Sequence, residues 1–288
     1  DEFIRVLRFA ASQKNIQVIA IKVTGLARFG LLEKLNEAPR LRSGVHDSES
    51  EKAEWERVRN RMIRICDAAI ETGIGVLVDA EESWIQDPID RITMEMMENY
   101  NKDKAVVYNT IQLYRHDRLD FLKLSHRIAK ERNFILGVKL VRGAYMEKER
   151  ARAASIGYVS PIQKDKAATD NDYNIALTYC FDHIDEIAYV IATHNEQSTM
   201  LAAQQLDAKG LPHHHPHVHF SQLYGMSDNI TFNLAKEGYS VSKYVPFGPI
   251  RDVVPYLMRR AQENSSVKGQ TGRELALIKK EMERRKAK

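Results

Sequence analysis

The stretch LGVKLVRGAY, residues 136–145, begins as an apolar run and ends in charged, small and aromatic residues. An apolar run of this kind is typical of a strand that is buried on both faces of a parallel sheet. Six further segments have the same form, with helix patterns between them: residues 18–26, 75–82, 105–113, 188–195, 217–225 and 239–248. This alternation predicts a (βα) barrel rather than a doubly wound sheet, and no GxGxxG follows the first strand.

The length of 288 residues suits one α/β barrel, so we predict a single domain over residues 1–288. The 43 basic and 39 acidic residues are interleaved, and no charged stripe suggests nucleic acid. Cys66 and Cys180 are interpreted as small buried hydrophobes in a reducing compartment. We recognise no signal or transit peptide, and no apolar run approaches the ~20 residues that span a bilayer.

Local signals predict where several helices begin and end. Asp87-Pro88 predicts a helix start, since proline is favoured in the first turn. Asn195 is placed to cap another helix, and Gly210 and Gly238 stand where C-terminal caps would be. Residues 36–52 form the main predicted loop.

Polar residues appear where each apolar run stops. In chain order they are Lys22, Asp79, Asn109 with Gln112, Lys139 with Arg142 and Tyr145, Thr193 with His194, Gln222 with Tyr224, and Lys243 with Tyr244. In barrels the active site lies at the C-terminal ends of the strands. One such residue is more often a strand leaving the core, but the whole set predicts a site at this end.

The segment PYLMRRAQENSS, residues 255–266, is the sharpest local feature. Tyr256, Arg259, Arg260 and Glu263 share one helical face. Two arginines beside a tyrosine suit a carboxylate, because guanidinium groups bind carboxylates in a bidentate way. The spacing alone is equally compatible with a solvated helix surface.

The segment PHHHPHVHF, residues 212–220, contains five histidines and suggests a metal site. It precedes the sixth predicted strand, which places it at the N-terminal end of the barrel, where residues serve stability. No carboxylate or cysteine lies nearby in sequence to complete a site. We therefore predict a surface loop and no metal. Likewise, the basic segment ELALIKKEMERRKAK predicts a mostly solvated amphipathic helix, with a weak contact to a membrane surface as the alternative.

The chain resembles the proline dehydrogenase family from about Val18 to Ser266. The similarity rests on the ordered strings IAIKVTGL, VLVDAEES, VKLVRGAYMEKERA, ATHNEQS, FSQLYGM, YVPFGP and PYLMRRAQENSS. It implies a distorted (βα)8 TIM-like barrel that binds FAD, with the last helix packed over the barrel mouth. Each string is weak by itself, and the combination is specific.

The resemblance also implies residue roles. As catalytic residues it implies Lys22, Asp79 and Lys139. Around the substrate it implies Leu140, Tyr145, Tyr244, Tyr256, Arg259 and Arg260. Around FAD it implies Asp79, Ala80, Asn109, Gln112, Lys139, Arg142, Gly143, Ala144, Thr193, His194, Gln222 and Glu263. Lys139 and Asn109 replace the arginine and glutamine of the commoner bacterial pattern.

The implied reaction is oxidation of L-proline to Δ1-pyrroline-5-carboxylate, by hydride transfer from C5 to flavin N5. A quinone would take the electrons, and the motifs look closest to mitochondrial members, which act at the matrix side of the inner membrane. A peripheral membrane association is a further expectation. Residues 36–52 are shorter than the insertion of those members.

Three alternatives stay open. Hydroxyproline dehydrogenase is a sister enzyme, disfavoured because its members tend to have serine where Tyr244 stands. A barrel aldolase or lyase would use Lys22 or Lys139 as a Schiff-base nucleophile. A non-catalytic metal-binding module would use the histidine segment.

Overall fold

Seven parallel strands form the centre of the molecule. The computed structural model describes residues 1–37, 48–246, 248–251, 253–258 and 270–286. The strands are β1 (Val18–Ile21), β2 (Gly75–Val78), β3 (Val107–Gln112), β4 (Leu136–Val141), β5 (Ile187–Ala192), β6 (Val218–Leu223) and β7 (Val241–Tyr244). Each pairs in parallel with the next strand of the sequence, in the order β1 to β7. The result is the curled parallel sheet of a distorted (βα)8-type barrel.

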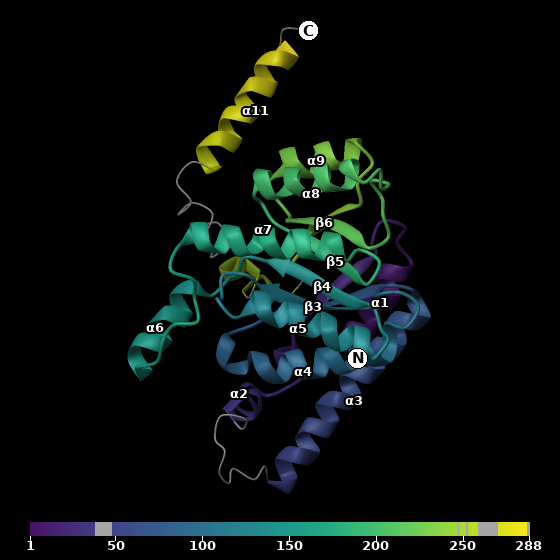
Figure 1. The fold of residues 1–288 in the computed structure, drawn as a ribbon, viewed down its shortest axis with the longest axis vertical. Coiled ribbons are helices and arrows are strands. Elements are labelled where there is room, and N and C mark those ends of the chain that lie inside the picture. Colours follow the sequence, from purple (N-terminus) through teal and green to yellow (C-terminus); the bar gives the residue numbers. More distant parts are fainter. Residues whose placement is uncertain (38–47, 247, 252, 259–269, 287–288) are drawn as a thin grey trace.

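Helices fill the connections and cover the outer side of the sheet (Figure 1). They are α1 (Glu2–Ala11), the short 3-10 helix η1 (Val23–Gly25), α2 (Phe29–Glu37), α3 (Glu49–Thr72), α4 (Ser83–Tyr100), α5 (Arg118–Glu131), α6 (Met146–Ile156), α7 (Lys166–Asp182), α8 (Glu196–Ala208), α9 (Asp228–Lys236) and α11 (Gln270–Lys286). Residues 250, 251 and 253–258 are also helical. Among the described helices, none is both long and apolar enough to cross a membrane.

All seven predicted strands are confirmed, and each ends earlier than its apolar pattern suggested. The fourth predicted strand ran to Tyr145, whereas β4 ends at Val141. Some of the predicted polar residues follow the strands, such as Lys22, Asp79 and Arg142, whereas others lie within them, such as Asn109, Lys139 and Tyr244.

The helix signals were only partly right. Asn195 caps α8, accepting a hydrogen bond from the Ser198 amide at 3.0 Å. The predicted start at Asp87-Pro88 was wrong, because α4 begins at Ser83 and contains Pro88. Proline disturbs the backbone hydrogen bonding there, and the Asp87 amide instead donates to the buried Asn36 side chain at 2.8 Å.

Much of the predicted loop at 36–52 is helical where the structure describes it. Helix α3 begins at Glu49, and Ser48 and Glu51 form a reciprocal capping box in front of it. This S-x-x-E pattern is a readable helix start, and its presence shortens the loop. Residues 38–47 lie outside the described part.

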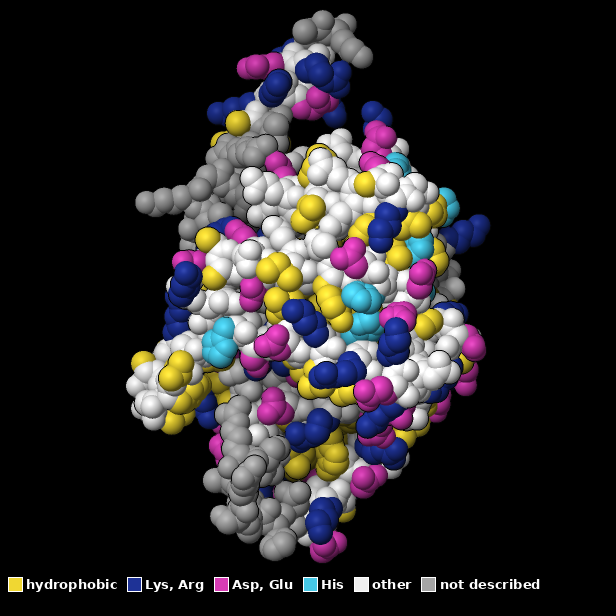
Figure 2. Space-filling model, in the orientation of Figure 1, with side chains coloured by type: hydrophobic (Ala, Val, Ile, Leu, Met, Phe, Trp, Pro, Cys, Tyr) yellow, Lys and Arg dark blue, Asp and Glu magenta, His cyan; other side chains and the backbone are white. Residues whose placement is uncertain are grey.

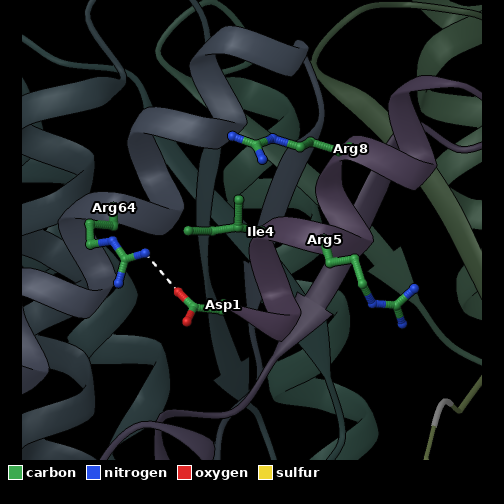
Figure 3. Close-up of a pocket in the computed structure, with 5 residues that line it drawn as sticks. All are labelled: Asp1, Ile4, Arg5, Arg8 and Arg64. Atoms are coloured by element: carbon green, nitrogen blue, oxygen red, sulfur yellow. Dashed lines mark hydrogen bonds and ion pairs between the residues drawn. The ribbon is translucent and has the colours of Figure 1, made fainter.

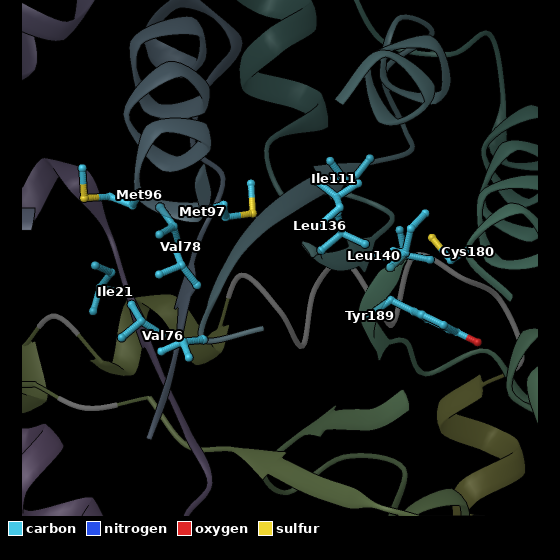
Figure 4. Packing of buried hydrophobic residues seen from close by; sticks show 14 of the residues in the cluster. Ile21, Val76, Val78, Met96, Met97, Ile111, Leu136, Leu140, Cys180 and Tyr189 are labelled. Atoms are coloured by element: carbon cyan, nitrogen blue, oxygen red, sulfur yellow. The ribbon is translucent and has the colours of Figure 1, made fainter. Parts of the chain in front are cut away.

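The hydrophobic core lies between the sheet and the surrounding helices. Figure 4 shows strand residues such as Val78, Ile111 and Leu140 packed with Met96 of α4 and Cys180 of α7. Burial of one large apolar side chain contributes roughly 1.5–3 kcal/mol, so this layer supplies the main stabilising force. Both cysteines are free and buried, as predicted, and burial raises the pKa of the Cys66 thiol to about 12. On the outside, basic and acidic side chains are interspersed over the face in Figure 2.

Candidate active site

An ion pair joins two strands at the mouth of the barrel. Lys139 of β4 places its Nζ 2.6 Å from Oδ1 of Asp79, which follows β2. The Tyr244 hydroxyl, from β7, donates to the other oxygen of Asp79 at 3.1 Å. The side chains of Lys139 and Asp79 are only 10% and 15% exposed, so each charge depends on the other for stabilisation. Burial, followed by the charge of Asp79, raises the pKa of Tyr244, which keeps its hydroxyl protonated.

Lys22 forms a second polar contact at the same mouth. It follows β1, and its Nζ donates to the Tyr145 hydroxyl at 2.8 Å. Burial lowers the pKa of Lys22, but Tyr145 and the carboxylates of Glu81 and Asp79 outweigh burial and raise it. A Schiff-base nucleophile needs a neutral amine, so a raised pKa counts against Lys22 in that role. The amine of Lys139 is already in an ion pair with Asp79, so it is not free to attack a carbonyl group.

The helical segment of residues 253–258 adds an aromatic side chain near β7. The rings of Tyr244 and Tyr256 lie 6.5 Å apart and are tilted by 32°. Tyr256 therefore lies beside Tyr244, whose hydroxyl donates to Asp79. Arg259, Arg260 and Glu263, which were predicted to complete this helix face, lie outside the described residues.

Arg142 connects the ends of two further strands. It follows β4, and its Nη1 donates to Oγ1 of Thr193, after β5, at 2.7 Å. His194, the next residue, makes a hydrogen bond through Nδ1 to Ser227 at 2.9 Å. Burial, and then the cations Lys243 and Arg142, lower the pKa of His194 to about 4, so its ring is neutral at pH 7.

Gln112 and Gln222 both lie buried at the mouth, but they differ in how they are hydrogen-bonded. Gln222 donates to the Thr193 carbonyl and accepts from Thr231 at 2.8 Å. Gln112 donates to the Glu81 carbonyl at 3.2 Å, while its Oε1 accepts no hydrogen bond within the described residues. A buried acceptor without a donor is costly, and a ligand with an N–H or O–H group would satisfy it.

Gly143 and Ala144 form the turn after Arg142. Gly143 has φ +137°, and a Cβ there would meet the Tyr114 ring at 2.3 Å. Only glycine fits this position. Ala80 and Ala144 are both half-buried, beside Asp79 and Tyr145 respectively.

The structure does not bring Asn109 and Leu140 to the mouth with the other predicted residues. The Asn109 amide donates to Asp90 of α4 at 2.9 Å, on the helix side of the sheet. Leu140 is fully buried in the hydrophobic core that also contains Cys180 of α7 (Figure 4). Successive side chains of a strand point to opposite faces, and these two positions have the core parity.

Sequence reasoning missed Glu81 as a member of this cluster. It is 4% exposed, and it accepts hydrogen bonds from the backbone and the hydroxyl of Thr24 at 3.1 and 2.7 Å. Burial raises its pKa. Its place in the acidic string DAEES, directly after a strand, was the available signal.

The histidine segment lies at the opposite end of the sheet; residues 212–217 precede β6, as predicted, and His219 lies within β6. His213 donates to the Glu237 carbonyl at 2.5 Å and stacks on Tyr239 with ring centres 4.0 Å apart. His217 donates to the Ile184 carbonyl at 2.6 Å. Over the described part of the chain, no group of three or more metal-ligating side chains is assembled.

A surface pocket of about 330 Å³ lies between α1 and α3 (Figure 3). It is lined by Asp1, Ile4, Arg5, Arg8 and Arg64. Asp1 and Arg64 face each other across it in an ion pair of 2.7 Å. None of its residues comes from the barrel mouth.

Comparisons with known proteins identify the family to which this chain is similar. Residues 4–273 match the family model described as proline dehydrogenase. The mitochondrial proline dehydrogenase 1 of Homo sapiens is 40% identical over 241 residues, which are 83% of this chain and 40% of that protein. The Drosophila melanogaster protein of the same name is 41% identical over 245 residues, which are 81% of this chain and 36% of that protein. This chain thus spans about two fifths of the length of these relatives.

Two further similarities extend over nearly the whole chain. The carbapenem antibiotics biosynthesis protein CarD of Pectobacterium carotovorum is 34% identical over 285 residues, covering 99% of this chain and 72% of that protein. The crystal structure of proline utilization A from Bdellovibrio bacteriovorus, inactivated by N-propargylglycine, superposes with a TM-score of 0.78. It covers 93% of this chain and 28% of that chain at 20% identity, and it supports the barrel fold. The chain therefore belongs to the proline dehydrogenase family.

Proposed function

We propose that residues 1–288 form a single FAD-binding barrel domain that oxidises L-proline to Δ1-pyrroline-5-carboxylate. The observation that carries the proposal is the Asp79–Lys139–Tyr244 cluster, which lies with Lys22 and Tyr145 at the mouth of a barrel of this family. Proline is a zwitterion with an apolar ring, so it needs charged groups at its two ends and a surround of carbon atoms between them.

The mouth offers these features in separate places. The tyrosines Tyr145, Tyr244 and Tyr256 would form the walls around the pyrrolidine ring. Asp79 and Lys139 would orient the ring and its nitrogen, because both are already fixed by an ion pair and a hydrogen bond. The carboxylate would be bound by Arg259 and Arg260, which lie outside the described residues.

FAD fits the remaining polar groups. The buried Oε1 of Gln112 lacks a donor, and Arg142 keeps two of its five N–H groups free of partners in the described structure. Gly143 and Ala144 follow this arginine in the chain, Thr193 accepts a hydrogen bond from it, and its charge acts on His194. When bound, FAD would supply N5 as the acceptor of the hydride from proline C5.

The protein groups hold the protons of the site in defined places. Tyr244 keeps its hydroxyl proton, since its pKa is raised, and its hydroxyl donates a hydrogen bond to Asp79. Lys22 keeps its ammonium charge, which favours a nearby electron-rich group. These side chains would orient the substrate, and none of them would act as a nucleophile on it. This is expected where a cofactor supplies the redox chemistry.

The electron acceptor would be a quinone, and the protein would act in mitochondria, at the matrix side of the inner membrane. This part rests on relatives that are named mitochondrial. A peripheral membrane association would bring the quinone within reach. The basic helix α11, with Leu275, Ile278 and Met282 each 53% exposed, is the segment that we would test for it.

The visible spectrum of the purified protein tests the proposal directly. We expect a flavin band at about 450 nm that bleaches when L-proline is added without oxygen. Bleaching by hydroxyproline alone would favour the sister enzyme, for which the tethered Tyr244 ring leaves little room. A colourless protein that also fails to take up added FAD would contradict the proposal.

A further inference from the structure

The guanidinium of Arg142 is held by four side chains from three elements. Its Nε donates to Asp170 Oδ1 of α7 at 2.6 Å, and its Nη2 donates to Ser198 of α8 at 3.0 Å. Its Nη1 donates to Thr193 at 2.7 Å, and its Cζ lies 4.3 Å from the centre of the Tyr173 ring. The arginine therefore joins the end of β4 to the loop after β5 and to the first turns of two helices.

Asp170 makes the only contact of this set that carries a full negative charge. Its second oxygen forms an ion pair with Lys166, one turn earlier on α7. Burial raises the pKa of Asp170, but the hydrogen bonds from Lys166 and Arg142 outweigh burial and lower it. The carboxylate is therefore ionised at neutral pH, and it bonds to Nε, the atom that sets the direction of the guanidinium plane.

We propose that Asp170 is a positioning residue for the cofactor site, acting through Arg142. This inference rests on the proposed function, because it assumes that the mouth binds FAD. The Arg142 side chain is 22% exposed and keeps one N–H on each Nη, so an electron-rich oxygen of a ligand can accept from it. Asp170 fixes the plane in which these two groups point before the ligand arrives.

Neutral partners alone hold the arginine less firmly. Thr193 and Ser198 are hydroxyls that also take part in other bonds, since Thr193 accepts from the Asn195 amide and Ser198 donates to Asn174. A charge-assisted hydrogen bond is roughly twice as strong as a neutral one. Without the carboxylate, the free Nη groups would have to be ordered by the ligand itself, and its affinity would fall.

A titration of the FAD-free protein with FAD tests this role. We expect Asp170→Asn, which keeps the shape but loses the charge, to raise the Kd for FAD at least about tenfold. Asp172→Asn is the matched control, because Asp172 lies on the same helix and accepts from Gln163 at 2.5 Å instead. We expect the control to stay within about twofold of the unaltered protein.

A double-mutant cycle separates positioning from general stability. If Asp170 acts through Arg142, Asp170→Asn should change the Kd little once Arg142→Met is present. Thermal unfolding of the FAD-free variants shows whether each one folds. If Asp170→Asn does not fold, Ser198→Ala, which removes a different contact of Arg142, tests whether loosening this arginine weakens FAD binding.

The outcomes are distinct. Equal FAD affinity in the Asp170→Asn and Asp172→Asn variants, or additive losses in the cycle, would overturn the positioning role. Failure of the unaltered protein to bind FAD would instead refute the proposed function, and this inference with it.

Discussion

The two ends of the parallel sheet both gather polar side chains, but they satisfy them differently. At the N-terminal end, His213 and His217 donate to backbone carbonyls, and His213 also contacts Asp207 at 2.9 Å. At the C-terminal end, and within the residues that the structure describes, Gln112 keeps a buried acceptor without a donor and Arg142 keeps two N–H groups without a partner. These two histidines are bonded within the protein, whereas Gln112 and Arg142 have bonding capacity left for a ligand.

This difference shows why residue type alone misleads. The histidine segment is the most conspicuous part of the sequence, yet His213 and His217 bond to backbone carbonyls of neighbouring loops. The mouth is inconspicuous in the sequence because its members come one at a time from different strands. A nearly buried ion pair such as Asp79–Lys139 is costly to desolvate, and function is the usual reason to keep it.

The largest expected effect contrasts two glycines, one at each end. Gly143→Ala should lower the free energy of unfolding by about 4 kcal/mol, since it combines backbone strain with a clash against Tyr114. Gly210→Ala, where φ is +65° and no atom lies within 4 Å of the added Cβ, should cost only the strain, about 1 kcal/mol. Denaturant titration measures both. Equal losses would mean that the turn after β4 is not tightly packed.

The next effect concerns the ion pair at the mouth. Asp79→Ala removes the acceptor shared by Lys139 and Tyr244, and a misplaced catalytic group can cost about a hundredfold in rate. We expect a loss of that size in the rate of anaerobic flavin reduction by proline, measured by stopped flow. The rate for Asp79→Asn should lie between the rates of the unaltered protein and Asp79→Ala. An unchanged rate in Asp79→Ala would remove this cluster from the mechanism.

Two buried histidines allow a comparison by pH. Burial lowers the pKa of both His194, at the mouth, and His219, on β6, from 6.5 to about 4. The unfolded chain therefore binds more protons between these values, so stability falls as pH falls, by up to about 1.4 kcal/mol per pH unit for each histidine.

Replacing either histidine should reduce this loss of stability at acidic pH. Only the replacement of His194, at the mouth, should weaken FAD binding. The variants are His194→Asn and His219→Gln, measured by thermal unfolding at several pH values and by FAD titration. A loss of FAD affinity in His219→Gln as large as that in His194→Asn would break the distinction between the two positions.

The smallest effect is expected in the histidine segment. The Glu237 carbonyl and then Asp207 raise the pKa of His213, so its contribution to stability is present below the unfolded pKa and is lost as pH rises through the folded one. His213→Gln should be slightly less stable than the unaltered protein at pH 6 and equal to it at pH 8. Flavin reduction by proline should stay within about twofold. A large loss of activity would show that this end of the sheet does more than hold loops.

The sequence predicted the fold better than it predicted the boundaries. Period and composition located all seven strands, because strands buried on both faces must be apolar. The start of α4 was misplaced, since proline is common in the first turn of a helix, whereas Pro88 lies inside a helix that begins at Ser83. The start of α3 was readable from Ser48 and Glu51 and was overlooked.

The residues predicted for the candidate site meet only in part. Polar strand ends identified the mouth, and the resemblance selected Asp79, Lys139 and Tyr244, which the structure brings together. The same reasoning included Asn109 and Leu140, whose side chains lie on the helix side of the sheet. Because side chains alternate along a strand, Leu140 faces away from Lys139 and Asn109 faces away from Gln112. Counting positions along the two strands would therefore have excluded Asn109 and Leu140 from the site.

The sequence by itself determined that this chain alternates strands and helices, buries an apolar layer and carries polar groups at one end of each strand. These features follow from local periodicity and solubility, which each segment expresses alone. Only the tertiary structure decided which groups meet. Asp170 reaches Arg142 because α7 folds back over β4, and Tyr244 reaches Asp79 because the sheet curls until β7 approaches β2. Contacts over such separations depend on how the layers pack, and the pattern of one segment does not contain that information.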